Sequence, residues 1–310
     1  MHHRFAGALL CLCLSVYGTV EARSLRVVTS ILPVHALVAS VMQGLGEPLL
    51  LLSGGASPHH YALKPSQASA LQAADVVFWV GPDLENFLLK PVQTIVAPGA
   101  SVALADTSGL TRYPYRDLAD DLKWNANTHR HSHASQGMDP HLWLDPHNAI
   151  VWLREIAEQL ARRDPENRSR YELNAQQMID QIEQKSAEIT SRLAGLETRP
   201  FVVFHDGYRY FEERFGMQAA GSITLSPELQ PSAERIQRVS RLIRQSKAVC
   251  IFSEPQFPTK LVQTVTNGLP IRREVLDPLG TNIAAGSSLY LELLERMTTS
   301  FEACLRGDGT

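Results

Sequence analysis

The stretch from Leu25 to Met42 reads LRVVTSILPVHALVASVM and decides the fold class. Leu25 to Thr29 is short, apolar and β-branched, which predicts a strand, and His35 to Met42 follows as a helix. The same alternation repeats downstream. Further strands are predicted at Pro48 to Ser53, Val76 to Gly81 and Ser101 to Ala105, and further helices at Ser66 to Ala74, with Ser66 as the N-cap, and at Leu84 to Ile95. Strands that alternate with helices favour a parallel sheet flanked by helices.

A second series of the same kind begins at Phe201. Its predicted strands are Phe201 to Phe204, Ala248 to Ser253 and Arg273 to Leu276, and its predicted helices are near Ala233 to Ile243, Pro258 to Thr266 and Ser287 to Ala303. Between the two series, Asp164 and Pro165 favour a helix start, and residues from Tyr171 to Leu193 keep one face of that helix apolar. A helix of about 30 residues would span roughly 45 Å. We therefore predict an α/β protein with two lobes, each a parallel sheet flanked by helices, joined by one long rigid helix.

The N-terminus is predicted to be a signal peptide covering about residues 1–22. Met1 to Arg4 contains one Arg, Ala6 to Val16 is apolar, and Val20-Glu21-Ala22 fits a small-residue cleavage site. The mature chain then divides into an N-terminal lobe at 23–146, a helical segment at 147–199 and a C-terminal lobe at 200–310. The apolar run is too short to span a bilayer, so we expect an exported, periplasmic protein whose mature chain does not insert into the membrane. A lipid anchor at Cys11 or Cys13 is the alternative, disfavoured because Leu precedes each of them.

The composition argues against a polyanionic partner. The 310 residues are 44% hydrophobic and 20% charged, as in an ordinary globular protein, and the formal net charge is -3. A nucleic acid or an anionic membrane would call for a clustered basic surface, so neither is predicted as a partner. We expect a monomer.

Two cysteines, Cys250 and Cys304, remain after removal of the signal peptide. Disulfides persist in exported proteins, so this even pair favours one bridge. Closing a loop of about 54 residues would stabilise the fold by roughly 4 kcal/mol in the chain-entropy model. The alternative, two thiolates as metal ligands, is disfavoured because Cys250 lies within a predicted strand and Cys304 within the last predicted helix.

One segment, Leu118 to Met138, has neither strand nor helix periodicity. It is polar and contains three alternating histidines, His129, His131 and His133. Its length exceeds that of an ordinary connection, which favours a functional or mobile loop. Two interpretations stay open: a solvated segment without a role, or an auxiliary site that collects metal weakly.

Three other histidines occupy places where a ligand is expected. His59 and His205 follow predicted strands, and His141 lies in the sequence DPHLWLDP at 139–146. Asp277 follows the last predicted strand in the matching place. Loops at the carboxyl ends of parallel strands converge on the ligand crevice. Three imidazoles and one carboxylate suit Zn²⁺ in a four-coordinate site and would also accept other first-row metals.

These positions fall within short motifs that resemble, in order, those of the cluster A-I family of metal-binding lipoproteins and periplasmic proteins. The motifs are Gly55-Ala56-Ser57-Pro58-His59, Pro65-Ser66, Asp139-Pro140-His141-x-Trp143-Leu144-Asp145-Pro146, His205-Asp206, Phe252-x-Glu254 and Leu276-Asp277-Pro278-Leu279-Gly280. They cover nearly the whole mature chain. Within that family the resemblance is strongest to the ZnuA-type zinc-binding protein, because the third ligand position is His205 and a His-rich loop precedes the second.

The resemblance implies a solute-binding protein of an ABC importer, which carries Zn(II) as its transported ligand to a membrane permease and is not an enzyme. It implies His59, His141 and His205 as ligands, with Asp277 or a water in the fourth position. His60 is the residue most easily confused with His59, and alignment of the motif selects His59.

Two other functions stay as alternatives. The manganese and iron members of the family typically have Glu at the third position, and Mn²⁺ is better served by two carboxylates than by one, so His205 argues against them. A zinc hydrolase would use a metal-bound water helped by a carboxylate such as Asp206, Glu254 or Asp277. The chain lacks a His-Glu-x-x-His sequence, and a bidentate Asp277 would take the place of that water.

Because histidine ligands must be neutral, metal affinity should fall below about pH 6.5.

Overall fold

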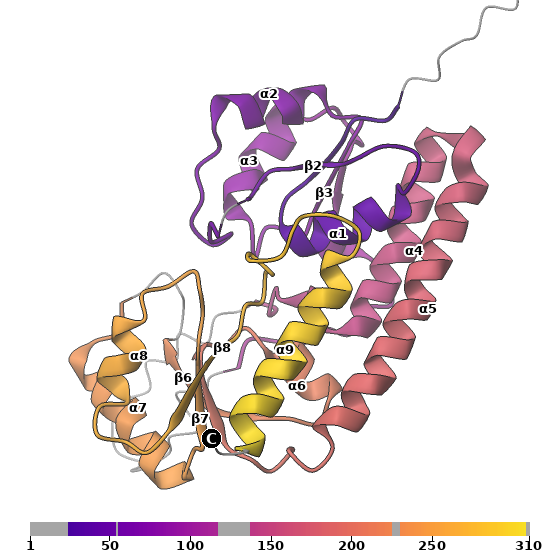
Figure 1. The fold of residues 1–310 in the computed structure, drawn as a ribbon. Coiled ribbons are helices and arrows are strands. Elements are labelled where there is room, and N and C mark those ends of the chain that lie inside the picture. Colours follow the sequence, from indigo (N-terminus) through magenta and orange to yellow (C-terminus); the bar gives the residue numbers. More distant parts are fainter. Residues whose placement is uncertain (1–23, 54, 117–136, 225–229, 308–310) are drawn as a thin grey trace, which may run out of the picture.

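The computed structural model describes residues 24–53, 55–116, 137–224 and 230–307. Within these ranges, two α/β lobes lie end to end and one long helix runs beside both (Figure 1). This confirms the predicted fold class. The predicted signal peptide and the loop histidines His129, His131 and His133 lie outside the described residues.

The sheet of the N-terminal lobe is parallel and has the strand order β2-β1-β3-β4. Its strands are β1 (Val27–Thr29), β2 (Leu49–Leu50), β3 (Val76–Trp79) and β4 (Ser101–Ala103). Val28 pairs with Leu49 on one side and with Val77 on the other, so β1 lies inside the sheet. Every residue of β1 and β3 is buried. Strands covered on both faces are apolar throughout, which explains the continuous VVT and VVFW runs.

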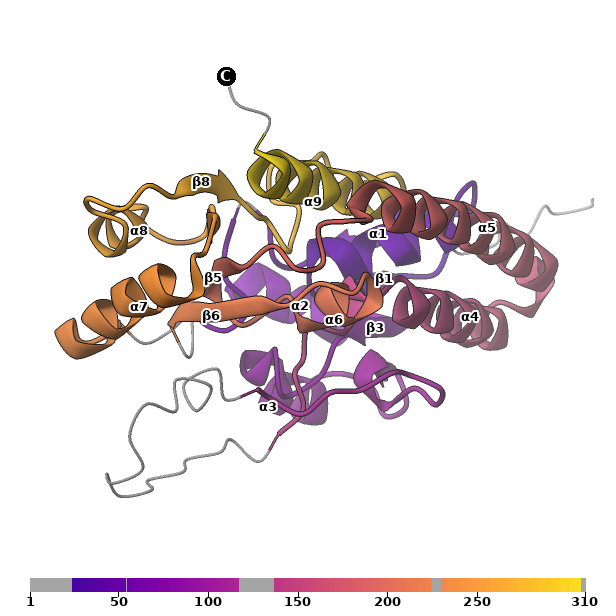
Figure 2. The ribbon, with the colours of Figure 1, turned by 90° about the horizontal axis from the view of Figure 1, so that it is seen from below.

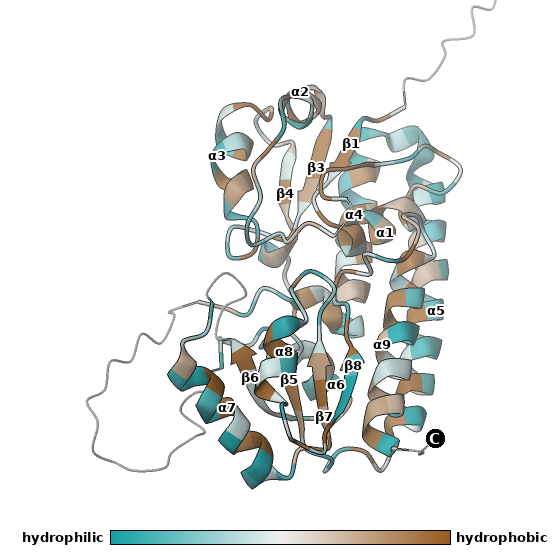
Figure 3. Ribbon diagram, turned by 60° about the vertical axis from the view of Figure 1, so that its left-hand side comes forward, coloured by the Kyte–Doolittle hydropathy of each residue, from teal (hydrophilic) through white to brown (hydrophobic). Residues whose placement is uncertain are grey.

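The sheet of the C-terminal lobe is also parallel and has the corresponding order β6-β5-β7-β8. Its strands are β5 (Phe201–His205), β6 (Ala219–Thr224), β7 (Cys250–Ser253) and β8 (Arg272–Val275). The sequence did not predict β6, because its first four residues are the small residues Ala-Ala-Gly-Ser rather than a β-branched run. Apolar colouring is concentrated on the strands β5 and β7 (Figure 3).

Nine α-helices and three short 3₁₀ helices in the described ranges surround the sheets. They are α1 (Leu32–Val41), α2 (Pro65–Ala73), α3 (Asn86–Thr94), η1 (Leu104–Asp106), η3 (Leu142–Leu144), α4 (Pro146–Arg163), η4 (Pro165–Asn167), α5 (Arg168–Leu193), α6 (Arg209–Arg214), α7 (Ala233–Ser246), α8 (Lys260–Val265) and α9 (Leu289–Arg306). The short helix α6 was not predicted. Ser66 is not the N-cap of α2: the cap is Lys64, because Pro65, with its fixed φ, takes the first helical position.

The long helix predicted after Asp164 is α5, which has 26 residues and follows the 3₁₀ turn η4. It packs beside α4 and, in the C-terminal lobe, beside α9 (Figure 2). Arg192 on α5 pairs with Glu295 at 2.7 Å and Glu302 at 2.6 Å on α9. One hydrophobic core runs through both lobes around these helices, and a smaller one lies between the C-terminal sheet and α7 and α8.

The disulfide between Cys250 and Cys304 is present and links β7 to α9. Its Cα atoms are 5.7 Å apart, within the usual range for such bridges. The described ranges contain no helix with the length and apolarity that a membrane span requires.

The strand β5 delivers its last residue toward the junction of the lobes. Val202 and Phe204 belong to the smaller core, whereas Phe201 and Val203 belong to the core shared by both lobes. Because side chains alternate along a strand, His205 projects on the side of Phe201 and Val203. The end of β5 therefore points its histidine at the interlobe region.

Candidate metal centre

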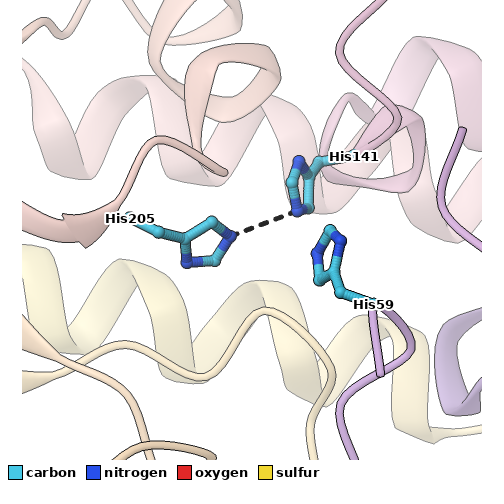
Figure 4. A group of neighbouring side chains, drawn as sticks. All are labelled: His59, His141 and His205. Atoms are coloured by element: carbon cyan, nitrogen blue, oxygen red, sulfur yellow. Dashed lines mark hydrogen bonds between the residues drawn. The ribbon is translucent and has the colours of Figure 1, made fainter. Parts of the chain in front are cut away.

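The structure brings His59, His141 and His205 together from three separate parts of the chain (Figure 4). His59 lies in the turn between β2 and α2, His141 directly precedes η3, and His205 ends β5. Unlike His205, His141 is not attached to a strand of either sheet. It follows an isolated antiparallel bridge between Pro114 and Met138.

One ring nitrogen from each of the three histidines lies within 4.8 Å of the others. The Nε2 atoms of His141 and His205 are 3.2 Å apart, and the ring centre of His59 is 5.5 Å from that of His141 and 6.0 Å from that of His205. Two ligands on one tetrahedral zinc, with bonds of about 2.1 Å, are separated by roughly 3.4 Å. His141 and His205 already have this spacing.

The three imidazoles line a cavity of ≈ 20 Å³ between the lobes. Trp143, Phe257 and Leu279 are among the apolar residues that complete its wall. His141 and His205 are each only 4% exposed. A space of this volume accommodates about one water-sized particle. The space between the three rings is therefore narrow and suits a single ion.

Each of the two buried histidines is held by a carboxylate. Asp139 Oδ1 accepts hydrogen bonds from both Nδ1 of His141, at 2.8 Å, and the backbone N–H of His141, at 3.0 Å. Glu254 Oε1 lies 2.6 Å from Nδ1 of His205. Since a carboxylate only accepts, Nδ1 carries a proton in both rings, and both Nε2 atoms face the cavity. They lie 3.2 Å apart, within hydrogen-bonding distance (Figure 4), so a proton on one of them or a metal ion between them satisfies both.

Burial and charge act in opposite directions on the pKa values of these histidines. Burial, helped by His141, His205 and His60, lowers the pKa of His59 to about 2, so that this imidazole is neutral and ready to bind a metal. Burial also lowers the pKa of His205, but Glu254 and the more distant Asp206 and Asp139 outweigh it and raise that pKa overall. The surroundings of His205 thus favour positive charge.

Residues 27–304 match the family model of ZnuA, described as zinc-uptake complex component A, periplasmic. The chain belongs to this family. It is 41% identical to the high-affinity zinc uptake system protein ZnuA of Brucella abortus (strain 2308) over 307 residues, covering 90% of this chain and 91% of the relative. The resemblance predicted from the sequence is confirmed.

Solved structures show the same fold at lower identity. A crystal structure of ZnuA superposes with a TM-score of 0.74 at 24% identity, covering 90% of this chain and 100% of that one. The solute-binding protein FpvC of Pseudomonas aeruginosa, in complex with Mn²⁺, gives a TM-score of 0.78 at 19% identity, with 93% and 100% covered. The two-lobe architecture of the ZnuA family is therefore shared with proteins whose structures hold a different metal.

Asp277, the predicted fourth ligand, is not part of the histidine group. Its Oδ1 accepts hydrogen bonds from Gln256 and from the backbone N–H groups of Leu279 and Gly280, at 2.8, 3.1 and 3.1 Å. Its Oδ2 accepts from the N–H and the hydroxyl of Thr281, at 2.6 and 2.7 Å. Both oxygens are engaged in ordering the loop after β8.

Three further histidines, His35, His60 and His147, lie in the described ranges and outside the cluster. His60 is exposed and lies outside the group, which agrees with the choice of His59. His35 is buried, with Nε2 3.1 Å from the carbonyl of Pro48, and His147 is exposed. In the described ranges, His59, His141 and His205 form the one cluster of metal-binding side chains.

Asp139 and Glu254 lie in the motifs quoted above, but the sequence did not predict that their carboxylates hold the histidine rings. Asp139 precedes His141 by two residues, and this spacing is a usable local signal. Glu254 is 49 residues from His205 in sequence, and only the pairing of β5 with β7 makes it a neighbour. The contact of Asp139 could therefore have been predicted from the sequence, whereas that of Glu254 could be predicted only once the order of the strands was known.

Proposed function

We propose that this protein captures one Zn²⁺ as cargo between its lobes and hands it to the membrane permease of an ABC importer. His59, His141 and His205 are the ligands. Water is the fourth ligand in preference to Asp277, whose two oxygens already accept five hydrogen bonds. The capture takes place in the periplasm, after removal of a signal peptide at about residues 1–22, and the carrier acts as a monomer.

The facing Nε2 atoms of His141 and His205 carry this proposal. Both rings point Nε2 into the space between the lobes, where loss of one shared proton frees both atoms for a metal, and both are held by a carboxylate on Nδ1. Imidazole nitrogen is a preferred donor for Zn²⁺, and a carboxylate on the opposite nitrogen raises its basicity. The name of the Brucella relative, a zinc uptake system protein, supports zinc as the cargo.

The alternative functions fit these residues less well. The cluster contains three imidazoles and no carboxylate, whereas Mn²⁺ favours oxygen donors. A hydrolase needs space for a substrate beside its metal-bound water, and the narrow space of ≈ 20 Å³ between the histidines offers little. We therefore propose a binding protein without enzymatic activity.

The proposal is tested by metal analysis of the mature chain, purified without added metal and then loaded. Mass spectrometry should find one zinc per chain, and competition against a calibrated chelator should rank zinc above manganese and iron(II). Preferential binding of manganese would make the protein a carrier for a different cargo. Absence of any tightly bound metal would overturn the site.

A matched pair of variants tests the ligand assignment. His59→Ala removes a donor and should reduce zinc affinity by two orders of magnitude or more, because loss of even an outer partner costs about 10–100-fold. His60→Ala changes the exposed neighbour and should leave affinity within about twofold, since it removes no donor. Equal losses in the two variants would show that the ligand is not His59.

A further inference from the structure

The segments on either side of residues 117–136 form a small antiparallel pair at the interlobe junction. The backbone N–H of Tyr115 donates to the carbonyl of Gly137 at 3.2 Å, and that of Asp139 donates to the carbonyl of Tyr113 at 2.9 Å. The pair ends at Asp139, whose carboxylate holds His141. One arm of this pair is therefore already part of the support of the metal centre.

The same pair packs against α6 of the C-terminal lobe. Tyr210 of α6 accepts a hydrogen bond from the N–H of Tyr113 at 3.2 Å and donates one to the carbonyl of Asp139 at 2.9 Å. Arg209 of α6 donates to the carbonyl of Pro114 at 2.6 Å and lies over the ring of Tyr113. The two antiparallel segments thus belong to the N-terminal lobe in sequence, but they are hydrogen-bonded to α6 of the C-terminal lobe.

Arg116, on the other arm, makes the strongest of these cross-lobe contacts. Its guanidinium donates to both oxygens of Glu212, at 2.8 and 3.0 Å. It also donates to Asp206, with Nε 3.0 Å from Oδ2 and a further contact from Nη2 to Oδ1. The side chain of Glu212 is fully buried, and those of Arg116 and Asp206 are 13% and 12% exposed. A planar guanidinium that meets two carboxylates in this way fixes the orientation of both.

Asp206 directly follows His205, so Arg116 constrains the backbone that carries this ligand. The ring of His205 is fixed by Glu254, and the peptide beyond it is tied by Arg116 to the segment that also carries Asp139. His141 and His205 are thereby held at their spacing by one structural unit. Displacement of Asp206 by even one ångström would change the separation of two atoms that must both bind one ion.

We infer that Arg116 is a positioning residue of the zinc site, which acts through Asp206 to hold His205 opposite His141. This inference rests on the proposed function. Loss of the guanidinium frees the end of β5 and also leaves Glu212 buried without its counter-ion, so a loss of stability is expected as well. A test must therefore separate the effect on the site from the effect on the fold.

Arg192→Gln is the matched control for Arg116→Gln. Arg192 also binds two carboxylates of a neighbouring element, Glu295 and Glu302 of α9, besides Glu188 on its own helix, and none of its described contacts is to the histidines. The thermal midpoint, the zinc affinity by chelator competition and the absorption spectrum of the Co²⁺-loaded protein are measured for the mature chain and both variants. We expect Arg116→Gln to weaken zinc binding at least tenfold and to alter the Co²⁺ spectrum, whereas Arg192→Gln lowers the thermal midpoint and leaves affinity within twofold.

Two further variants keep the inference testable if Arg116→Gln does not fold. Arg116→Lys keeps the charge without the planar fork and should give an affinity between those of wild type and Arg116→Gln. Asp206→Asn retains the pair with Glu212 and should weaken zinc binding about fivefold with a changed Co²⁺ spectrum. Wild-type affinity and spectrum in Asp206→Asn, or in a folded Arg116→Gln, would overturn the inference while leaving zinc capture intact. Failure of wild type itself to bind zinc would overturn the proposed function as well.

Discussion

The two lobes are built on the same plan but make different use of it. In each, the first strand lies between the second and the third, so that the chain reverses direction across the sheet between β1 and β3 and between β5 and β7. A glutamate follows the third strand of each sheet, Glu85 after β3 and Glu254 after β7. Crevices at such reversal points are the usual ligand sites of parallel sheets.

Only the glutamate of the C-terminal lobe contacts the histidine cluster. Glu254 meets the ring of His205 at 2.6 Å, whereas Glu85 accepts a hydrogen bond from the backbone of Gly81 at 2.9 Å. The N-terminal lobe supplies His59 from the loop after β2 and His141 from the segment before η3. In both lobes the strand order brings a glutamate to the corresponding edge of the sheet. The group that it contacts decides its use: Glu254 holds the ring of His205, and Glu85 holds the backbone of Gly81.

The largest expected effect comes from removing the histidine of the C-terminal lobe. His205→Ala should reduce zinc affinity by about a thousandfold, or roughly 4 kcal/mol, because His205 is the one member of the cluster that this lobe supplies. Isothermal titration with zinc in a chelator buffer measures the loss. Affinity within tenfold of wild type would mean that the N-terminal lobe holds the metal unaided.

The next largest effect is on stability, and it tests whether the buried Glu85 of the N-terminal lobe keeps its proton in the folded protein. Burial raises the pKa of Glu85 from 4.5 to about 7, against the opposing effects of Ser30 and the backbone of Gly81 and Val80. Between these pH values the folded protein keeps a proton that the unfolded chain has released. The free energy of unfolding therefore falls as pH rises from about 4.5 to about 7, by about 3 kcal/mol at about 1.4 kcal/mol per pH unit.

Glu85→Gln cannot lose this proton, so the variant should be more stable than wild type by up to about 3 kcal/mol at pH 8 and equal to it near pH 4. Urea denaturation of the metal-free proteins across this range measures the difference. Glu183→Gln, on the exposed face of α5, serves as the control and should show little change at any pH. A variant that is less stable than wild type at pH 8 would contradict the prediction.

A smaller effect is expected from the corresponding change in the other lobe. Glu254→Gln weakens the partner of His205 Nδ1 and should reduce zinc affinity by about 10–100-fold, as is usual for outer partners of metal-bound histidine. Glu85→Gln should leave affinity unchanged, since Glu85 contacts none of the three ligands in the described interactions. If both variants lost affinity equally, the two glutamates would not differ in function.

The smallest effect should follow deletion of residues 125–135, which removes His129, His131 and His133. All three ligands of the cluster lie outside this segment, so one zinc site should remain with affinity within about twofold of wild type. Stoichiometric titration before and after deletion measures this. Loss of the tight site would show that the segment supplies one of its ligands.

The sequence predicted the fold and the three histidines because both leave local signals. Strands such as Phe201 to Phe204 are apolar runs followed by a polar residue, and His205 occupies that position, whereas His59 lies further along the loop that follows its strand. The sequence did not predict β6 or α6, since Ala-Ala-Gly-Ser has low β-propensity and a six-residue helix carries too little periodicity.

The contacts of Asp277 could not be predicted from the sequence. Its position after β8 is that of a ligand, but the turn that follows directs three backbone N–H groups and the Thr281 hydroxyl at its carboxylate. Aspartate commonly satisfies turns in this way. Which of the two uses prevails depends on the path of the loop in three dimensions, and a linear pattern does not specify that path. The contacts of Glu254 and Arg116 depend on tertiary structure for the same reason.

The narrow space between the histidines affects how the proposed zinc carrier would discriminate against Mg²⁺ and Ca²⁺. An ion held by all three histidines exchanges hydration water for imidazole nitrogen beside apolar side chains. Mg²⁺ dehydrates reluctantly and retains several waters in most protein sites, and Ca²⁺ requires six to eight oxygen ligands. Both ions would have to exchange oxygen donors for three imidazole nitrogens. For the proposed carrier, dehydration and donor type therefore act together in favour of a transition metal.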